Sequence, residues 1–325
     1  MKRTPTALLG ATALAATLGL AACSEDSAGS DDQDSYQIGI TQIVEHPSLD
    51  AAREGFKQAL TDAGLEVSYD EQNAQGDQST ATSIATTFAG DDLDLVLAIA
   101  TPTAQASVQA ITDVPILITA VTDPVEAGLV DSWEAPGGNV TGTSDINPVD
   151  EQLGLLADLA PDVQTVGIVY SAGEVNSQIQ VDLARTAAED LGLQIEEATV
   201  TNSSEVQQAA ESLDVDAYYV PTDNTVVSAL EALLQVAESR SQPVIAADGA
   251  SVERGAVATY GLDYERLGYQ TGEMAVQVLT EGADPAQMPV QTLEELSLIL
   301  HTGAAERIGL ELPAELVDSA DTVYE

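Results

Sequence analysis

The sequence predicts an α/β fold of two lobes, each built on a parallel sheet covered by helices on both faces. Three observations lead to this class. Short apolar runs alternate regularly with longer segments whose apolar residues repeat at helical spacing. Two of the runs, LDLVLAIA and PILITAV, are apolar on both faces and rich in branched residues, as fully covered strands are. The 325 residues also suit two domains.

The first series of elements accounts for one lobe. Its first helix has apolar residues at helical spacing from Leu49 onward and stops before Gly64. The series comprises strands at 37–43, 65–69, 93–100 and 115–121 and helices at 49–63, 79–88 and 104–111.

The same rhythm restarts at Asn147 and predicts the second lobe. Helices are expected at 147–159, 175–191, 204–213 and 224–239, and strands at 165–170, 194–200, 217–220, 243–247 and 255–260. Periodicity alone leaves one large sheet as the alternative to two lobes.

Composition excludes several classes of function. The net charge of −45 opposes binding to nucleic acid and to anionic lipid through the folded surface. One Cys excludes an internal disulfide framework and a Cys-rich zinc site, and two distant His residues are poor material for a metal site. The sequence lacks G-x-S-x-G, Walker A, G-x-G-x-x-G and H-E-x-x-H motifs. We therefore expect no cofactor and no catalysis, with an anchored hydrolase as the enzymatic alternative.

The N-terminus has the layout of an export signal. Lys2 and Arg3 precede an apolar run at 7–20, which is shorter than the roughly 20 residues that span a bilayer. The following LAAC segment resembles the bacterial lipobox, in which Cys23 is lipidated and becomes the first residue after cleavage. The alternatives are an ordinary signal peptide or a buried free cysteine. Residues 23–35, poor in apolar side chains and rich in acids, are expected to form a flexible linker.

Polar loops follow the predicted strands and are the expected binding site. In open parallel sheets ligands bind beyond the carboxyl ends of the strands, where helix N-termini present free N–H groups. The loops there are rich in Thr, Asn and Asp, which are also common helix caps. Their convergence on a cleft between two lobes favours binding. They are QIVEHP, TPT, TAVTDP, YS, PTDNT, ADG and YGLDY.

Several of these segments resemble one known family. The stretch IGITQIVEHPSLDAAREGFKQAL, with ATPTAQA, TAVTDPVEAGLV, PTDNTVVSAL and IAADGASVERGAVATYGLDYERLGYQTG, is similar to the tryptophan/tyrosine-type substrate-binding lipoproteins of ABC importers. The resemblance extends from Tyr36 to the C-terminus. It implies a type I periplasmic-binding fold, with two Rossmann-like lobes joined by a three-strand hinge. The N-terminal lobe is then expected at 36–143 plus about 264–288, and the C-terminal lobe at 144–263 plus about 289–325.

The resemblance also implies roles for individual side chains. Thr101 and Thr103 begin a helix and suit an α-carboxylate. Asp248 suits the α-ammonium, with Asp123 and Asp223 as rivals.

Other residues are expected to complete the site. Tyr260 or Tyr264 is a candidate to stack on the ligand's side chain. His46 precedes a proline and is either a turn residue or a ligand contact. Further polar contacts are expected from Gln42, Asn176, Asn224 and Thr225.

The resemblance therefore implies an extracytoplasmic, lipid-anchored protein that captures a small solute by closure of its lobes. An amino acid is expected as the ligand, and a sugar or nucleoside is the alternative. The expected partners are an ABC permease with its cytoplasmic ATPase, and the chain is expected to be a monomer. A ligand sensor of the same fold that partners a membrane receptor is the other interpretation.

Overall fold

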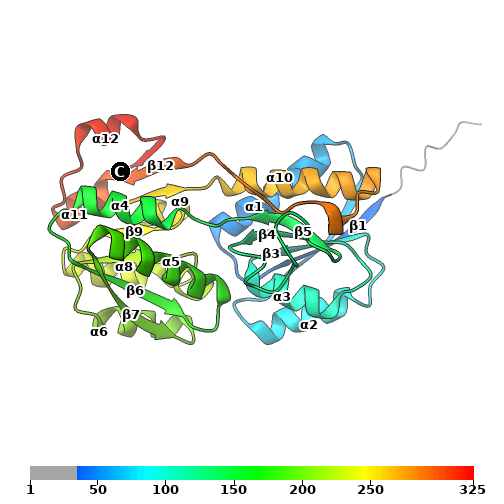
Figure 1. The fold of residues 1–325 in the computed structure, drawn as a ribbon, viewed down its shortest axis with the longest axis horizontal. Helices are drawn as coiled ribbons and strands as arrows, with labels where there is room; N and C mark the ends of the chain where they lie inside the picture. The colour runs from blue at the N-terminus through cyan, green and yellow to red at the C-terminus, as the bar shows by residue number, and fades with distance from the viewer. Residues whose placement is uncertain (1–34) are drawn as a thin grey trace, which may run out of the picture. The chain divides into compact units, whose positions relative to one another are not determined.

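The computed structural model describes residues 35–325 and contains two sheets, each flanked by helices (Figure 1). The predicted signal, Cys23 and nearly all of the predicted linker lie outside the described residues. The two sheets and their helices, called here the first and the second lobe, confirm the predicted fold class. The predicted domain boundaries stay a prediction.

The first lobe has a six-stranded sheet in the order β11-β5-β4-β3-β1-β2, all of whose pairs are parallel. Its central strands are buried along their whole length because helices cover both faces, whereas the edge strand β2 alternates between half-buried and exposed. The strands are β1 (Tyr36–Gln42), β2 (Val67–Asn73), β3 (Leu95–Ile99), β4 (Ile116–Val121), β5 (Val140–Ser144) and β11 (Gln291–Thr292). The helices are α1 (Pro47–Asp62), α2 (Gln78–Phe88), α3 (Thr101–Ala110) and α10 (Tyr264–Val276), followed by the short helical turns η2 (Gln277–Glu281) and η3 (Pro285–Gln287).

The second lobe has a seven-stranded sheet in the order β13-β12-β10-β9-β8-β6-β7. One pair in it, β10 with β12, is antiparallel, because β12 enters this sheet from the first lobe. The strands are β6 (Thr165–Ser171), β7 (Gln194–Val200), β8 (Ala217–Val220), β9 (Val244–Ala246), β10 (Ala258–Gly261), β12 (Ser297–His301) and β13 (Thr322–Tyr324). The helices are α4 (Val149–Leu159), α5 (Val175–Leu191), η1 (Ser203–Glu205), α6 (Val206–Ser212), α7 (Asn224–Val227), α8 (Leu230–Ser239), α9 (Gly249–Glu253), α11 (Thr302–Ile308) and α12 (Ala314–Ser319).

Local differences from the predicted elements are small. The helix expected at 224–239 is divided into α7 and α8, because Ala229 leaves the helical conformation at φ −126° and ψ 29°. The structure also has elements that were not predicted, namely β5, β13, α9, α11 and α12. The short helix α9 is capped by Asp248, whose carboxylate accepts a hydrogen bond from the Ser251 backbone N–H at 3.0 Å.

The chain crosses between the lobes three times, at 145–148, 262–263 and 293–296 (Figure 1). The prediction was a hinge of three strands; the structure has three crossings, but all of them lie outside the strands. After the second crossing α10 packs tightly against α1: a Cβ built on Gly268 would lie 1.8 Å from the Ala52 carbonyl oxygen. A glycine is therefore required at this close approach.

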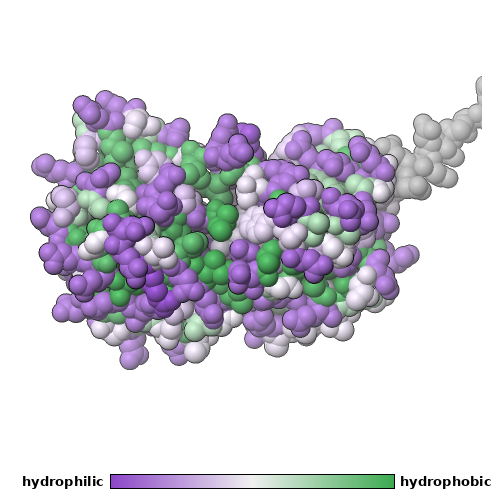
Figure 2. Space-filling view, in the orientation of Figure 1, coloured by the Kyte–Doolittle hydropathy of each residue, from purple (hydrophilic) through white to green (hydrophobic). Residues whose placement is uncertain are grey.

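Hydrophilic residues cover most of the face shown in Figure 2, in keeping with the acidic composition. Within 35–325, none of the helices combines the length and the apolar character needed to cross a membrane.

Candidate ligand-binding site

A small cavity of about 30 Å³ lies where the two lobes meet. The first lobe supplies the loop after β1 with the start of α1, and the ends of β3 and β4. The second lobe supplies the start of α5, the loop before α7, and the loop before α9. The cavity is lined by Val44, His46, Ser48, Leu49, Ala100, Ala120, Thr122, Asp145, Asn176, Thr222, Asp223, Asn224, Val227, Asp248 and Tyr264.

Three buried aspartates dominate the electrostatics of the cavity. Asp145, Asp223 and Asp248 are between 0 and 3% exposed. None of the described residues that line the cavity is a lysine or an arginine. The walls are therefore built to hold positive charge.

Asp145 lies in the first crossing of the hinge. Its carboxylate accepts hydrogen bonds from the Tyr264 hydroxyl at 2.8 Å and from the Thr122 hydroxyl at 3.3 Å. Burial raises the pKa of the Asp145 carboxyl to about 6, although both hydrogen bonds lower it in part. Burial also raises the pKa of the Tyr264 phenol well above its usual range, so Tyr264 stays a donor to Asp145.

Asp223 is anchored within the second lobe. Its carboxylate accepts from the Ser171 backbone N–H at 2.6 Å, the Ser177 hydroxyl at 2.7 Å and the Val226 backbone N–H at 2.7 Å. Burial, and after it the nearby Glu174 carboxylate, raises the pKa of Asp223. A cation in the cavity would relieve both effects.

Asp248 connects the two lobes. Its carboxylate accepts a hydrogen bond from the Ser48 hydroxyl, at the start of α1, at 3.0 Å. It also accepts from the Ser251 hydroxyl at 2.6 Å, within its own helix cap. A direct, buried hydrogen bond thus joins the two lobes.

Two further polar atoms of the cavity wall are buried without a hydrogen-bond partner in the described chain, namely His46 Nε2 and Asn176 Oδ1. The Asn176 amide nitrogen donates to the Thr222 carbonyl oxygen at 2.8 Å and to a Glu174 carboxylate oxygen at 3.2 Å. Both of these oxygens are acceptors, so the amide nitrogen must face them, and Oδ1 is the atom left without a partner. Such unpaired buried atoms are costly unless a ligand satisfies them.

Four of the ten predicted binding residues line the cavity: Asn176, Asp223, Asn224 and Asp248. Their roles in binding stay predictions. Tyr264, the alternative to Tyr260, and His46 line it as well.

The other six predicted residues are not among its lining residues, and the side chains of Thr103 and Asp123 bond nearby backbone groups. The Thr103 hydroxyl donates to the Ile99 and Ala100 carbonyl oxygens. The Asp123 carboxylate accepts from the Val125 and Glu126 backbone N–H groups and so forms a turn.

The Thr225 hydroxyl donates to Glu174. Tyr260 lies on β10, where its backbone carbonyl oxygen accepts from Gln152. Thr101 is buried beside the lining residue Ala100, and its hydroxyl has no partner among the described residues.

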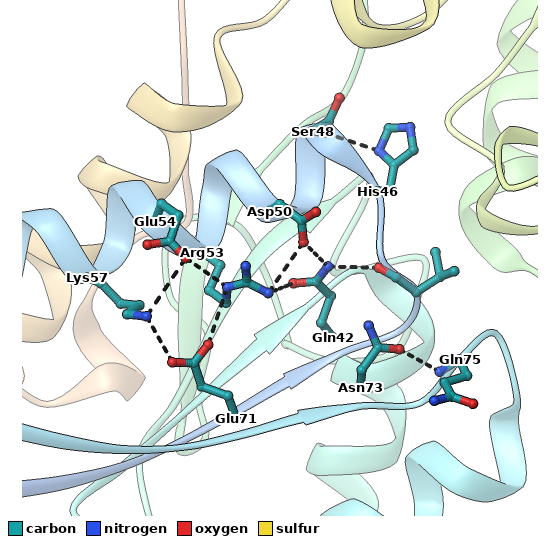
Figure 3. A network of polar contacts seen from close by, with 11 residues as sticks. Gln42, His46, Ser48, Asp50, Arg53, Glu54, Lys57, Glu71, Asn73 and Gln75 are labelled. Carbon is teal, nitrogen blue, oxygen red and sulfur yellow. Dashed lines mark hydrogen bonds and ion pairs between the residues drawn. The ribbon is translucent and has the colours of Figure 1, made fainter.

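Gln42 does not line the cavity, but it bonds residues of the loop that does (Figure 3). Its amide nitrogen donates to the Val44 carbonyl oxygen and to Asp50, both at 2.8 Å, while its amide oxygen accepts from Arg53 at 3.3 Å. The network continues through ion pairs of Arg53 and Lys57 with Glu71. Gln42 therefore holds the loop that carries Val44 and His46.

No individual role was predicted for Asp145, Ser48, Thr122 or Thr222, although Thr122 and Thr222 lie in the predicted binding loops TAVTDP and PTDNT. Only the hinge crossing brings Asp145 to the cavity. The one available signal was the polar run DINP at the predicted start of the second lobe. In the part of the chain that the structure describes, no group of three or more His, Cys, Asp or Glu is arranged to hold a metal ion.

Comparisons with known proteins match nearly all of the described chain. The family model described as ABC transporter substrate binding protein matches residues 37–324. The chain is 45% identical over 294 residues to the Tyrosine-binding protein of Clostridioides difficile (strain R20291), which covers 89% of this chain and 85% of that protein.

Two solved structures of relatives differ in how closely they match this one. A Streptococcus pneumonia ABC domain in complex with L-Trp is 36% identical and has a TM-score of 0.86. The ligand-free, open structure of a substrate binding protein with adhesive properties from Clostridium difficile is 46% identical but has a TM-score of 0.68. Each match covers 89% of this chain and 99% of the other. The structure is therefore more similar to that of the ligand-bound relative, although the open relative has the more similar sequence.

Proposed function

The chain belongs to the ABC transporter substrate binding protein family, and we propose that it captures a free aromatic amino acid between its lobes for an importer. Members of this family bind small solutes outside the cytoplasm. The relatives named above include one called a tyrosine-binding protein and one solved with L-Trp. Both ligands combine an ammonium, a carboxylate and an aromatic ring.

The observation that carries the proposal is the buried aspartate cluster without a lysine or arginine among the residues lining the cavity. An α-ammonium placed there forms charge-assisted hydrogen bonds and compensates the buried negative charge. The free Oδ1 of Asn176 supplies another acceptor for it. A neutral sugar would leave the aspartate charges uncompensated.

The apolar part of the wall supports an aromatic side chain. Val44, Leu49, Ala100, Ala120 and Val227 line the cavity together with the ring of Tyr264. Small residues such as alanine leave room for a ring, and Tyr264 offers an aromatic neighbour.

We propose capture by closure. Residues of both lobes line the cavity, so an amino acid enters it only when the lobes move apart. The hinge crossings then absorb the rotation, and ligand contacts to both lobes stabilise the closed form. We propose no covalent chemistry.

The proposed partners are a permease and its ATPase, reached by anchoring through Cys23. Two or more acyl chains hold a soluble domain at a membrane, since each buried CH₂ contributes about 0.8 kcal/mol. Replacement of Cys23 by Ser is expected to move the protein from the membrane fraction into the soluble fraction after cell fractionation. Unchanged membrane association would contradict lipid anchoring.

The ligand is tested by titration calorimetry and thermal shift with L-tryptophan, L-tyrosine, L-phenylalanine, glucose and adenosine. A ligand at 100 times its Kd adds about 2.7 kcal/mol of stability, which a thermal shift detects. Binding of an aromatic amino acid supports the proposal. Binding of glucose or adenosine alone would retain the fold and overturn the assigned ligand, and an in vivo uptake assay separates import from sensing.

A further inference from the structure

We propose that His46 is a specificity-determining residue that donates its Nε2–H to the carboxylate of the bound amino acid. This inference rests on the proposed function. It names the residue that binds the ligand's carboxylate, which the buried aspartates repel. The carboxylate was expected at Thr101 and Thr103, but neither residue lines the cavity, and the Thr103 hydroxyl is engaged by backbone carbonyl oxygens.

The helix cap fixes the tautomer of His46. His46 is the N-cap of α1, and its Nδ1 accepts a hydrogen bond from the Ser48 backbone N–H at 3.2 Å (Figure 3). Pro47 has no N–H, so Ser48 carries the first free backbone donor of the helix. An Nδ1 that accepts carries no hydrogen. The single hydrogen of the neutral imidazole therefore lies on Nε2.

This hydrogen has no acceptor within the described chain. His46 is 9% exposed, lines the cavity, and its Nε2 is buried without a partner. Burial lowers the pKa of His46 below its usual value, and Arg254 adds to this effect, while Asp248 and Asp50 oppose it. The ring is therefore neutral near pH 7 and presents one N–H donor to the cavity.

The position of His46 at the start of α1 makes a carboxylate the best-suited acceptor for its Nε2–H. His46 stands at the N-terminus of a 16-residue helix, where the partial positive charge favours an anion. Ser48 bonds His46 through its backbone N–H and Asp248 through its hydroxyl, so a donor and a carboxylate lie side by side. An α-amino acid presents its carboxylate and ammonium on one carbon, which matches this pair.

The test compares ligands with and without the carboxylate. His46→Asn keeps a good helix cap but removes Nε2–H. We expect the Kd for L-tryptophan to rise about ten- to hundredfold, the loss of a hydrogen bond to a charged group. The Kd for tryptamine, which lacks the carboxylate, is expected to stay within twofold of its wild-type value.

The chain contains a matched control. His301 caps α11 in the same manner, with Nδ1 accepting from the Ala304 backbone N–H at 3.3 Å, and it does not line the cavity. His301→Asn is expected to leave both Kd values unchanged. A second variant, His46→Asp, also caps the helix but adds a negative charge. It should raise the Kd for L-tryptophan more than His46→Asn does.

The outcomes separate the two proposals. If the wild-type protein binds none of L-tryptophan, L-tyrosine and L-phenylalanine, the proposed function fails. If it binds them and His46→Asn retains full affinity, only the role of His46 fails. An equal loss of affinity for L-tryptophan and for tryptamine would assign His46 a structural role and would also overturn the inference.

Discussion

The Ser48 hydroxyl of the first lobe donates a hydrogen bond to the Asp248 carboxylate of the second lobe at 3.0 Å, although 200 positions separate the two residues in the sequence. Both residues line the cavity, and both are buried. Because the bond joins the two lobes, we expect it to break when they move apart. It is then expected to favour the closed form of the ligand-free protein.

Removal of this bond is expected to weaken ligand binding. Ser48→Ala deletes the hydroxyl without changing the backbone N–H that His46 caps. Because the closed form loses roughly 1 kcal/mol relative to the open form, the Kd for the amino acid should rise about fivefold. Small-angle scattering of the ligand-free variant should give a larger radius of gyration.

Ser251→Ala is the control for this change. The Ser251 hydroxyl also donates to Asp248, at 2.6 Å, but from the same lobe. It should alter thermal stability without changing the radius of gyration. Equal radii for wild type and Ser48→Ala would contradict the role of the bond in closure.

Asp145→Asn is expected to separate stability from binding. The buried carboxylate has a raised pKa, so its ionised form destabilises the ligand-free protein at pH 7.5. The substitution should raise the free energy of unfolding by about 1 to 3 kcal/mol and weaken binding of an ammonium-bearing ligand more than tenfold. Chemical denaturation and calorimetry measure the two effects.

Asp123→Asn serves as the matched control, because Asp123 forms a turn and does not line the cavity. It should leave the Kd unchanged. Lower stability of Asp145→Asn together with unchanged affinity would show that Asp145 has a structural role alone.

The pKa of Asp145 predicts a pH dependence with a definite sign. A carboxyl whose pKa rises from 3.8 in the unfolded chain to about 6 in the fold binds its proton more tightly when folded. Its contribution therefore destabilises the fold above pH 6, and the loss is relieved as pH falls toward 4. The stability difference between Asp145→Asn and wild type should be largest above pH 6 and should vanish near pH 4.

Ligand affinity should follow the opposite course. Since an ammonium binds the ionised carboxylate, the Kd should rise up to tenfold for each pH unit below about 6. Asp223, whose pKa is also raised, contributes in the same direction. A Kd that is constant between pH 5 and 7.5 would argue against an ammonium beside these aspartates.

Gly268 tests the packing of α10 on the first lobe, and Gly154 in α4 is its control. Gly268→Ala would bring a Cβ to 1.8 Å from the Ala52 carbonyl oxygen, so α1 and α10 must separate. We expect a loss of about 1 to 3 kcal/mol in the free energy of unfolding. Gly154→Ala, inside α4 with nothing within 4 Å, should instead add about 0.5 to 1 kcal/mol. Denaturation curves in which Gly268→Ala is as stable as Gly154→Ala would contradict this packing.

Most of the fold was predictable because its signals are local. The apolar runs of β3 and β4 are buried on both faces, as their composition predicts. The break between α7 and α8 was missed, because the apolar pattern continues across Ala229 while the backbone does not. The antiparallel β12 depends on where the third crossing enters the second sheet.

The candidate site was predictable to a smaller extent. Asp223 and Asp248 were found because they follow strands, where a parallel sheet collects its binding loops. Thr103 and Asp123 have the same sequence signal, yet their side chains satisfy nearby backbone groups. A helix cap and a ligand contact use the same residue types, so the pattern alone does not separate them.

By itself, the sequence determined the fold class, the family and the acidic, cation-favouring character of this protein, because these follow from periodicity, composition and motifs along the chain. Only the tertiary structure decided which polar residues face the cavity. Asp145 reaches it through a hinge crossing, and Ser48 meets Asp248 across the lobes. The physical reason is that these contacts join residues far apart in the chain, and their geometry depends on how the hinge crossings orient the lobes.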